Sequence, residues 1–326
     1  MRVLVSGVTG FMGSAIARQL LDAGHEVRGL TRNAQRARRK FSEVQQAPDA
    51  LATGKLTFVE GDVTEPDTLR PAVESMDVVV QAAQFSGAPV EDPARGLTYM
   101  NVDRNGTLNL LDAIASAYGA QTAGPGMYRF PGDAPRFLYL SGVTVNRDSP
   151  HRWDQAKWQA EEAIRGSGLD WTILRSSPAY GPEDRSFNRL IGYSDYLPFV
   201  PLFGDGEEKL TPVYVEDVGR IFARLVEDRE AARSLTLPFG GPQVVTMNEM
   251  IRTMLEIMGR RRFLLHIPKP VGKIQGLVLQ LLPGQILSAD AVDFAAQGGA
   301  ADLSLLRERF PGFSPTPLRE GLSRYL

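Results

Sequence analysis

The sequence lacks cysteine and has few histidine and lysine residues. The absence of cysteine excludes disulfide bonds, thiol catalysis and thiolate metal ligands. Imidazole is available only from His25, His151 and His266, and their spacing matches no metal-ligand motif. We therefore expect no metal site.

The sequence also lacks an excess of one charge and any long apolar run. Its 36 Lys and Arg residues nearly balance its 38 Asp and Glu residues, so the formal net charge is −2. This balance predicts no general attraction to nucleic acid. No apolar run reaches the roughly eighteen residues of a membrane span, and the first expected strand begins at residue 2, which leaves no room for a signal peptide. We expect a cytoplasmic protein that binds no nucleic acid.

A glycine-rich turn is the most informative motif that is present. The β-prone residues 2–6 run into Gly7, Gly10 and Gly13, and an amphipathic helical pattern follows. In such a strand–turn–helix unit, Gly7 permits the tight turn, Gly10 lets the backbone approach a pyrophosphate, and Gly13 lets the helix pack closely on the strand. The amides and the positive dipole end of that helix attract phosphates. The motif predicts a dinucleotide site.

Strand-like and helix-like segments alternate through the first half of the chain. This alternation predicts an α/β fold with a doubly wound parallel sheet. Expected strands cover 2–6, 26–31, 56–60, 77–82, 136–141 and 171–175, and expected helices cover about 11–23, 66–74, 97–117 and 153–166.

The 326 residues can hold one large domain and a smaller lobe. We assign 1–177 to a Rossmann dinucleotide-binding domain and 178–326 to a mixed α/β substrate lobe, with 208–230 returning to the main sheet. Four glycines and three prolines in 118–135 predict a long surface loop.

Several motifs together resemble the extended and atypical short-chain dehydrogenase/reductase superfamily, including the NAD-dependent epimerase/dehydratase-like proteins. The most similar group is that of the NADPH-carrying accessory subunit of respiratory complex I. The resemblance covers nearly the whole chain and is carried by Gly7–Gly13, Gly61-Asp62-Val63, Ala82-Ala83, Asn101-Val102, Gly106-Thr107, Ser141, Tyr180-Gly181-Pro182, Val215-Glu216-Asp217-Val218 and 313–322.

The resemblance implies roles for residues around the cofactor. Thr9, Phe11 and Met12 would lie with the three glycines beside the diphosphate. Asp62 and Val63 would lie beside the adenine. The small side chains of Ala82 and Ala83 would let the backbone pass close to the ribose and the nicotinamide.

The end of the second expected strand favours NADP(H) over NAD(H). NAD-specific sites place a carboxylate there to bind the ribose hydroxyls. Residues 29–32 contain no acid, whereas Arg32 can meet a 2′-phosphate, with Thr31 as a hydroxyl donor. The following basic residues Arg38, Arg39 and Lys40 are interpreted as a solvated helix face.

The catalytic residues depart from the pattern of the superfamily. Active members carry Tyr-x-x-x-Lys, in which the phenol transfers a proton while the lysine lowers its pKa and holds the nicotinamide ribose. Lys157 stands at the lysine position, but Trp153 replaces the tyrosine, and an indole is no general acid. Ser141 and Thr144 are the candidate hydroxyl residues.

Three interpretations stay open. The first is a reductase whose chemistry needs no tyrosine and whose substrate is a small molecule, with a hydrophobic molecule as one option. The second is a non-catalytic NADPH-binding structural or sensing subunit. The third is an RNA-binding relative, which the charge balance disfavours.

Residues 271–287 allow a further contact. Ile274, Leu277, Val278, Leu281 and Leu282 repeat at helical spacing before Pro283 and Gly284. A helix packed on the lobe is the plainest interpretation; a lid over a hydrophobic substrate, or a contact with a membrane surface or partner subunit, are the alternatives. The sequence leaves the oligomeric state open.

Overall fold

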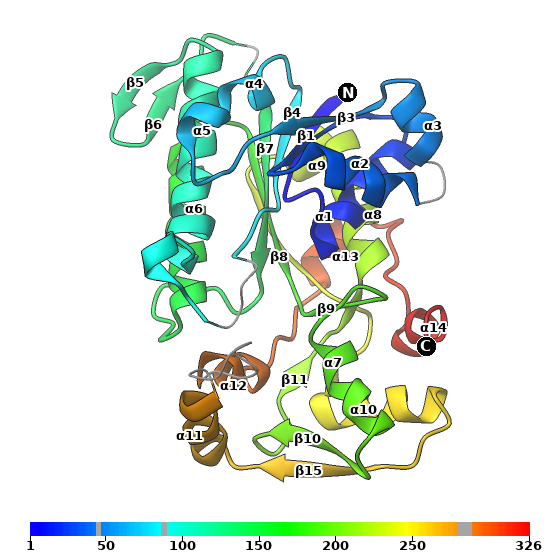
Figure 1. Ribbon diagram of the computed structural model, residues 1–326. Helices are drawn as coiled ribbons and strands as arrows, with labels where there is room; N and C mark the ends of the chain where they lie inside the picture. Colours follow the sequence, from blue (N-terminus) through cyan, green and yellow to red (C-terminus); the bar gives the residue numbers. More distant parts are fainter. Residues whose placement is uncertain (44–46, 86–89, 133, 280–288) are drawn as a thin grey trace.

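A parallel seven-stranded sheet forms the centre of the computed structural model, which describes residues 1–326 apart from 44–46, 86–89, 133 and 280–288 (Figure 1). The strand order is β13-β8-β7-β4-β1-β2-β3. These strands are β1 (Arg2–Ser6), β2 (Glu26–Thr31), β3 (Leu56–Glu60), β4 (Val78–Gln81), β7 (Arg136–Gly142), β8 (Trp171–Ser176) and β13 (Leu235–Phe239). The order reverses at β1, with β2 on one side and β4 on the other, which is where such sheets open a ligand crevice at their carboxyl ends.

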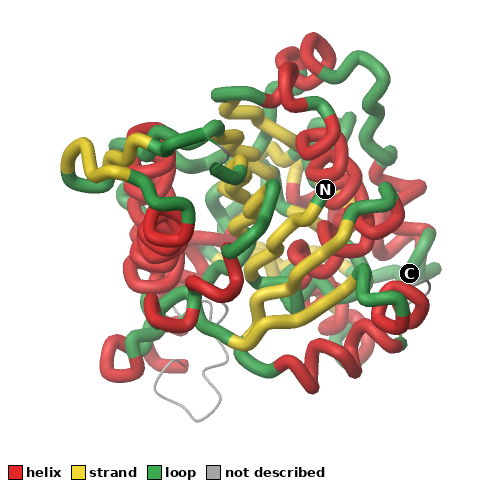
Figure 2. Tube along the Cα trace, turned by 90° about the horizontal axis from the view of Figure 1, so that it is seen from above, coloured by secondary structure: helices red, strands yellow, loops and turns green. Residues whose placement is uncertain are grey.

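Helices cover both faces of the sheet (Figure 2). One apolar core joins the sheet to α1 (Phe11–Asp22), α2 (Ala34–Ser42), α3 (Ala47–Ala52), α8 (Val215–Glu227), α9 (Arg229–Ala232) and α13 (Ser304–Arg309). The other core joins it to α4 (Arg70–Val73), α5 (Gly106–Ala117) and α6 (Arg152–Gly166). Because both faces are buried, the strands are continuously apolar, as in the Val-Val-Val run of β4. The doubly wound α/β fold expected from the sequence is confirmed.

A smaller lobe lies at the carboxyl end of the sheet and has its own apolar core. Its strands pair in three short sheets: β9 (Ala179–Tyr180) with β12 (Val213–Tyr214), β10 (Phe199–Phe203) with β15 (Phe263–Ile267), and β11 (Lys209–Leu210) with β14 (Val245–Thr246). Its helices are α7 (Phe187–Gly192), α10 (Met247–Ile257), α11 (Lys269–Leu279), α12 (Ala289–Ala295) and α14 (Leu318–Ser323).

Residues 208–230 were expected to return to the main sheet, and for the strands in this segment that prediction is wrong. Among the described residues, β11 and β12 pair inside the lobe and not with the main sheet, and Pro212 between them has no amide to continue a ladder. The helical part does return, because α8 packs on α1. The strand that joins the main sheet beside β8 is β13, an edge strand that tolerates Pro238.

Two other segments differ from the expectation in detail. The expected loop at 118–135 contains a hairpin of β5 (Gln121–Gly124) and β6 (Met127–Arg129), turned at Gly126 with φ +70°. The expected helix at 97–117 begins as a π-helix over Met100–Asn105 before α5. Of the segment 271–287, residues 280–287 lie outside the described residues. None of the helices in the described parts of the chain has the length and apolarity needed to cross a membrane.

Candidate functional site

The glycine turn between β1 and α1 leaves no room for side chains. Gly7 has φ +62°, and a Cβ on it would lie 2.7 Å from the Cα of Ala83. A Cβ on Gly13 would lie 2.2 Å from the carbonyl oxygen of Gly7. Gly10 stands at the N-cap of α1, where no described side chain caps the helix. The first amides of α1 therefore remain available to an anion.

A buried polar cluster fixes the opposite wall of this turn. The Ser6 hydroxyl accepts hydrogen bonds from the amides of Ala82 and Ala83, at 2.9 and 3.0 Å. It donates to the side chain of Gln81, which in turn donates to the Thr107 hydroxyl at 3.4 Å. These bonds hold the carboxyl ends of β1 and β4 together, so the backbone at Ala82 and Ala83 lies directly against the glycine turn.

Arg32 and Asp62 lie together at the ends of β2 and β3. The Arg32 side chain is 67% exposed, and its Nε lies 3.9 Å from an oxygen of Asp62. The Asp62 carboxylate also accepts from the amide and hydroxyl of Thr64, both at 2.9 Å. The Thr31 hydroxyl accepts from the Asn33 amide at 3.3 Å, so it serves the turn after β2. A cation and a carboxylate thus border the same edge of the crevice.

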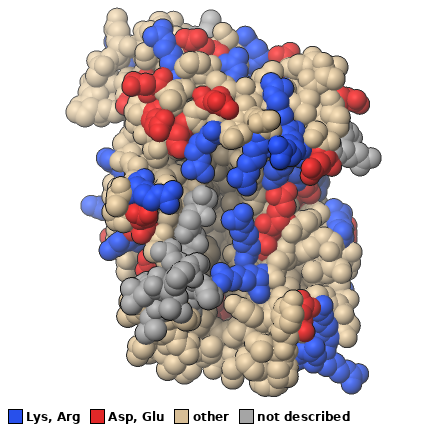
Figure 3. All heavy atoms as spheres, in the orientation of Figure 1, with Lys and Arg blue, Asp and Glu red and all other residues tan. Residues whose placement is uncertain are grey.

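Lys40 is placed differently from the solvated face expected for it. Its Nζ donates to the carbonyl oxygen of Thr9 at 3.1 Å and forms an ion pair with Glu183 at 2.5 Å. Lys and Arg atoms gather over α2, along the edge of a hollow in the middle of the face in Figure 3. The sequence does indicate this placement, because Lys40 follows the buried Ala37 by three residues and therefore lies on the same side of the helix.

Trp153 occupies the start of α6 inside an aromatic group. Its ring stacks on His151 with 4.4 Å between centroids and also contacts Tyr99 and Phe294, at 6.0 and 5.6 Å. The indole nitrogen donates to the side-chain oxygen of Gln297 at 3.1 Å. The indole is therefore fixed in place by packing and by one hydrogen bond.

Thr144 belongs to a network around the buried Asp154. The Thr144 hydroxyl donates to one carboxylate oxygen of Asp154 at 2.8 Å. Ser149 and the amide of Gln297 donate to the other oxygen, at 2.8 and 2.7 Å. Because Gln297 also accepts from Trp153, the network links Thr144 to the indole.

Lys157 is held by a different acid. Its Nζ lies 3.0 Å from an oxygen of Asp103 in the π-helix, and the two side chains are 12% and 2% exposed. The ammonium also lies 5.6 Å from the ring centroid of Tyr139. Burial alone lowers the pKa of Lys157, but Tyr139 and the carboxylates of Asp103 and Glu161 raise the pKa overall. Lys157 therefore stays charged at neutral pH.

Ser141 faces a third acid. Its hydroxyl donates to Glu161 at 2.7 Å, and Arg175 binds both oxygens of the same carboxylate at 2.9 and 2.6 Å. The described hydrogen bonds thus direct Ser141 and Thr144 to separate carboxylates and join neither hydroxyl to Lys157. Asp154 and Glu161 were not predicted as partners, although they form a polar stripe with Lys157 at helical spacing on α6.

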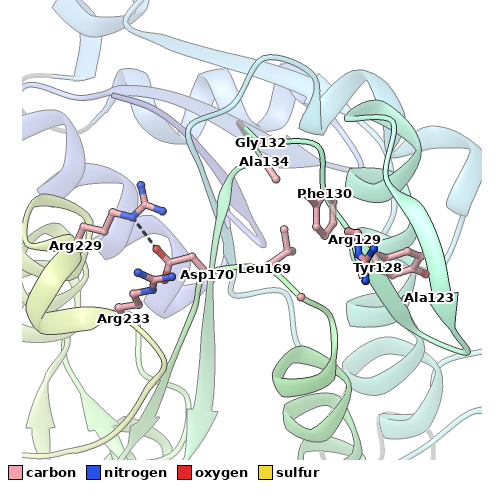
Figure 4. Close-up of a pocket in the computed structure, with 11 residues that line it drawn as sticks. Ala123, Tyr128, Arg129, Phe130, Gly132, Ala134, Leu169, Asp170, Arg229 and Arg233 are labelled. Atoms are coloured by element: carbon pink, nitrogen blue, oxygen red, sulfur yellow. Dashed lines mark hydrogen bonds and ion pairs between the residues drawn. The ribbon is translucent and has the colours of Figure 1, made fainter.

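A cavity of about 470 Å³ opens at the amino ends of β7 and β8, away from the glycine turn. Figure 4 shows Tyr128 and Phe130 on one side and Arg229 on the other, where Arg229 pairs with Asp170 at 2.7 Å. None of the residues that the sequence places at the cofactor site or the catalytic site lines this cavity.

Comparison with known proteins identifies the family. The model of the NAD dependent epimerase/dehydratase family matches residues 3–236. The chain is 24% identical over 269 residues to the NADH dehydrogenase [ubiquinone] 1 alpha subcomplex subunit 9 of Arabidopsis thaliana, which aligns with 82% of this chain over 61% of its own length. It is 28% identical to the photosystem II assembly factor Ycf39 of Synechocystis over 100% of this chain and 90% of that protein.

Solved structures share the fold. The UDP-glucuronic acid 4-epimerase of Bacillus cereus aligns with a TM-score of 0.72 and 18% identity, over 100% of this chain and 98% of that one. The NADPH-dependent quinone oxidoreductase QOR2 of Escherichia coli aligns with a TM-score of 0.70 and 17% identity, over 99% of both chains. With the glycine turn, the strand order and the family match in agreement, the chain belongs to the NAD-dependent epimerase/dehydratase family of the extended short-chain dehydrogenase/reductase superfamily, whose members bind a nicotinamide dinucleotide.

Proposed function

We propose that the protein binds NADP(H) at the glycine turn and acts as a reductase that does not use a tyrosine acid. The observation that carries the cofactor assignment is Arg32, a largely exposed guanidinium at the end of β2 whose one ion pair among the described residues is a long contact to Asp62. A 2′-phosphate is a stronger partner for this planar group than a carboxylate at 3.9 Å. Asp62 then remains bound to Thr64 beside the adenine.

The glycine turn fits the dinucleotide because the space that a side chain at Gly7 or Gly13 would need is already filled by backbone. When bound, the reduced nicotinamide supplies a hydride. Lys157 keeps its charge beside Asp103, so it is poorly suited to release a proton. We assign the proton for the reduced product to water.

The substrate side favours an apolar acceptor. Trp153, Tyr99 and Phe294 present aromatic rings where a sugar-modifying relative would need a phenol and free hydroxyls. An activated carbon–carbon double bond or a quinone needs hydride delivery and no specific side-chain acid. The relatives include a divinyl chlorophyllide a 8-vinyl-reductase and a structure of a quinone oxidoreductase, which agree with this class of acceptor.

A second candidate is a nucleotide-binding subunit without turnover. It is favoured by the hydrogen bonds that tie the hydroxyls of Ser141 and Thr144 to Glu161 and Asp154. The resemblance to a complex I subunit favours it too, although the chain spans only about three fifths of that relative.

The cofactor is tested by denaturing the purified protein and identifying the released nucleotide, then by calorimetric titration with NADPH and NADH. Arg32→Ala removes a charged hydrogen bond of about 1.5–3 kcal/mol, so the affinity for NADPH should fall tenfold or more. The affinity for NADH should change little. Arg39→Ala is the control, because Arg39 is an exposed cation on α2, seven residues after Arg32, and it should leave both affinities unchanged. Equal losses for both nucleotides in Arg32→Ala would contradict the assignment.

A turnover measurement distinguishes the reductase from the nucleotide-binding subunit without turnover. NADPH oxidation is followed by absorbance with a panel of quinones, enones and simple carbonyl compounds. We expect oxidation with the first two classes and none with the carbonyl compounds. Tight NADPH binding with no oxidation by any acceptor would favour the subunit without turnover.

A further inference from the structure

Helix α11 turns its small residues inward and its large apolar residues outward. Gly272 and Gly276 are buried, and a Cβ on Gly272 would lie 2.6 Å from the ring of Phe203 and 3.2 Å from Val292. Val271, Ile274 and Leu277 follow at a spacing of three residues and are 46%, 63% and 53% exposed. Residues at this spacing share one helix face. A helix that only stabilised the lobe would bury these side chains rather than its glycines.

Neighbouring elements of the lobe carry further exposed apolar residues. α12 packs on α11 and carries Phe294, which is 56% exposed. β15, at the same end of the lobe in Figure 1, carries the exposed Phe263 and Leu265. We call Phe263, Leu265, Val271, Ile274, Leu277 and Phe294 the apolar end. Large exposed apolar surfaces of this kind mark an interaction site.

The stretch of chain that carries β15 and α11 is positively charged. No acidic residue occurs between Glu256 and Asp290, whereas this stretch contains Arg260, Arg261, Arg262, Lys269 and Lys273 in a chain of net charge −2. Three of these cations pair with acids on other elements: Arg260 with Asp195, Lys269 with Glu208 and Lys273 with Asp293. Arg261 and Arg262 have no carboxylate partner among the described residues. Arg261 and Arg262 directly precede Phe263, so these cations border the apolar end at the start of β15, at the opposite end of that strand from α11. An exposed apolar surface bordered by cations without a carboxylate partner is complementary to an anionic lipid surface.

We propose that the apolar end docks on an anionic lipid surface. Val271, Ile274 and Leu277 enter the boundary between headgroups and acyl chains, while Arg261 and Arg262 meet the anionic headgroups. The protein then rests on the membrane without crossing it. Phe294 contacts Trp153, so an apolar molecule leaving the lipid would first meet the aromatic group of the site; this last step, unlike the docking, rests on the proposed function.

Docking is tested with the full chain by co-sedimentation with vesicles of phosphatidylcholine alone and of phosphatidylcholine mixed with phosphatidylglycerol. The wild type should bind the mixed vesicles at least tenfold more strongly, and added salt should weaken that binding. The double variant Ile274→Gln/Leu277→Gln should lose at least tenfold in binding while its thermal midpoint and NADPH affinity stay unchanged. Arg261→Gln/Arg262→Gln should remove most of the salt dependence.

Met127→Gln is the matched control, because Met127 is a similarly exposed apolar residue, at 50%, on the hairpin at the opposite end of the molecule. It should bind vesicles like the wild type. The proposal is overturned if the wild type binds neither vesicle, or if the control loses as much as the α11 variant. Dimerisation that Ile274→Gln/Leu277→Gln abolishes, without lipid binding, would assign the surface to a second copy of the chain. NADPH binding is measured separately, so a failure of docking leaves the cofactor assignment untouched.

Discussion

The ammonium group of Lys157 lies 3.0 Å from a carboxylate oxygen of Asp103, and the two side chains are almost completely buried. The pair joins α6 to the π-helix that precedes α5, so it connects two elements over the same face of the sheet. π-Helical turns often occur at functional sites, and here the turn places Asp103 against the lysine.

Removal of one member of this pair should be costly. In Asp103→Asn the Lys157 charge stays buried without its partner, and such changes typically cost about 3–5 kcal/mol. Urea unfolding should show this loss in the free energy of unfolding. The double variant Asp103→Asn/Lys157→Met should recover most of it, because no unpaired charge remains. A single variant as stable as the wild type would show that the pair is not needed.

Alkaline pH should destabilise the protein, because Lys157 and the neighbouring Tyr139 then lose their protons. Burial raises the pKa of Tyr139, and its charged neighbours raise the pKa of Lys157 despite burial. In the unfolded chain these side chains lose their protons at about pH 10 to 10.4, while in the folded protein they keep them to higher pH. The stabilisation is therefore complete below about pH 10 and declines as the pH rises, by up to about 1.4 kcal/mol per pH unit for each group. Urea unfolding at several pH values measures this slope, which should be shallower in Asp103→Asn/Lys157→Met.

The glycine turn should not tolerate a methyl group. Gly13→Ala places a Cβ 2.2 Å from the Gly7 carbonyl oxygen, so the turn or the helix must move. Nucleotide affinity should fall at least tenfold, measured by calorimetry. Gly166→Ala is the control, because no atom lies within 4 Å of its Cβ, and it should leave nucleotide affinity unchanged. Normal affinity in Gly13→Ala would contradict the assignment of the site.

A tyrosine at position 153 should not restore carbonyl reduction by itself. Trp153→Tyr supplies a phenol, but the hydroxyls of Ser141 and Thr144 remain bound to Glu161 and Asp154. We expect nucleotide binding as in the wild type and no reduction of simple carbonyl compounds above its level. Carbonyl turnover in this variant would show that the proton donor was the only missing group.

Local chemistry made the sheet and the glycine turn predictable. Short β-branched runs, three glycines at fixed spacing and the helical pattern after them all act within a few residues of one another. β13 escaped prediction because its Leu-Thr-Leu-Pro-Phe sequence contains a proline, which only an edge strand accepts. An isolated sequence does not indicate which strand will form the edge.

The partners of the expected catalytic residues could not be predicted in the same way. Trp153 and Lys157 were found by their spacing in the superfamily's Tyr-x-x-x-Lys pattern, but the groups that bind them come from elsewhere in the chain. Gln297 reaches Trp153 across 144 residues, and Asp103 reaches Lys157 from another helix. Such contacts depend on how the helices and the lobe pack, which residue spacing alone does not reveal.

The late strand β13 also determines how the two parts of the molecule are connected. After β8 the chain enters the lobe, comes back as α8 and β13, leaves again, and comes back once more as α13 before it finishes in α14. A truncation after residue 177 would remove β13, one of the two neighbours of β8, and uncover α1, so the first half should not fold as an independent fragment. Several segments of the chain connect the lobe to the sheet. Any movement of the lobe over the crevice must therefore bend all of these connections together.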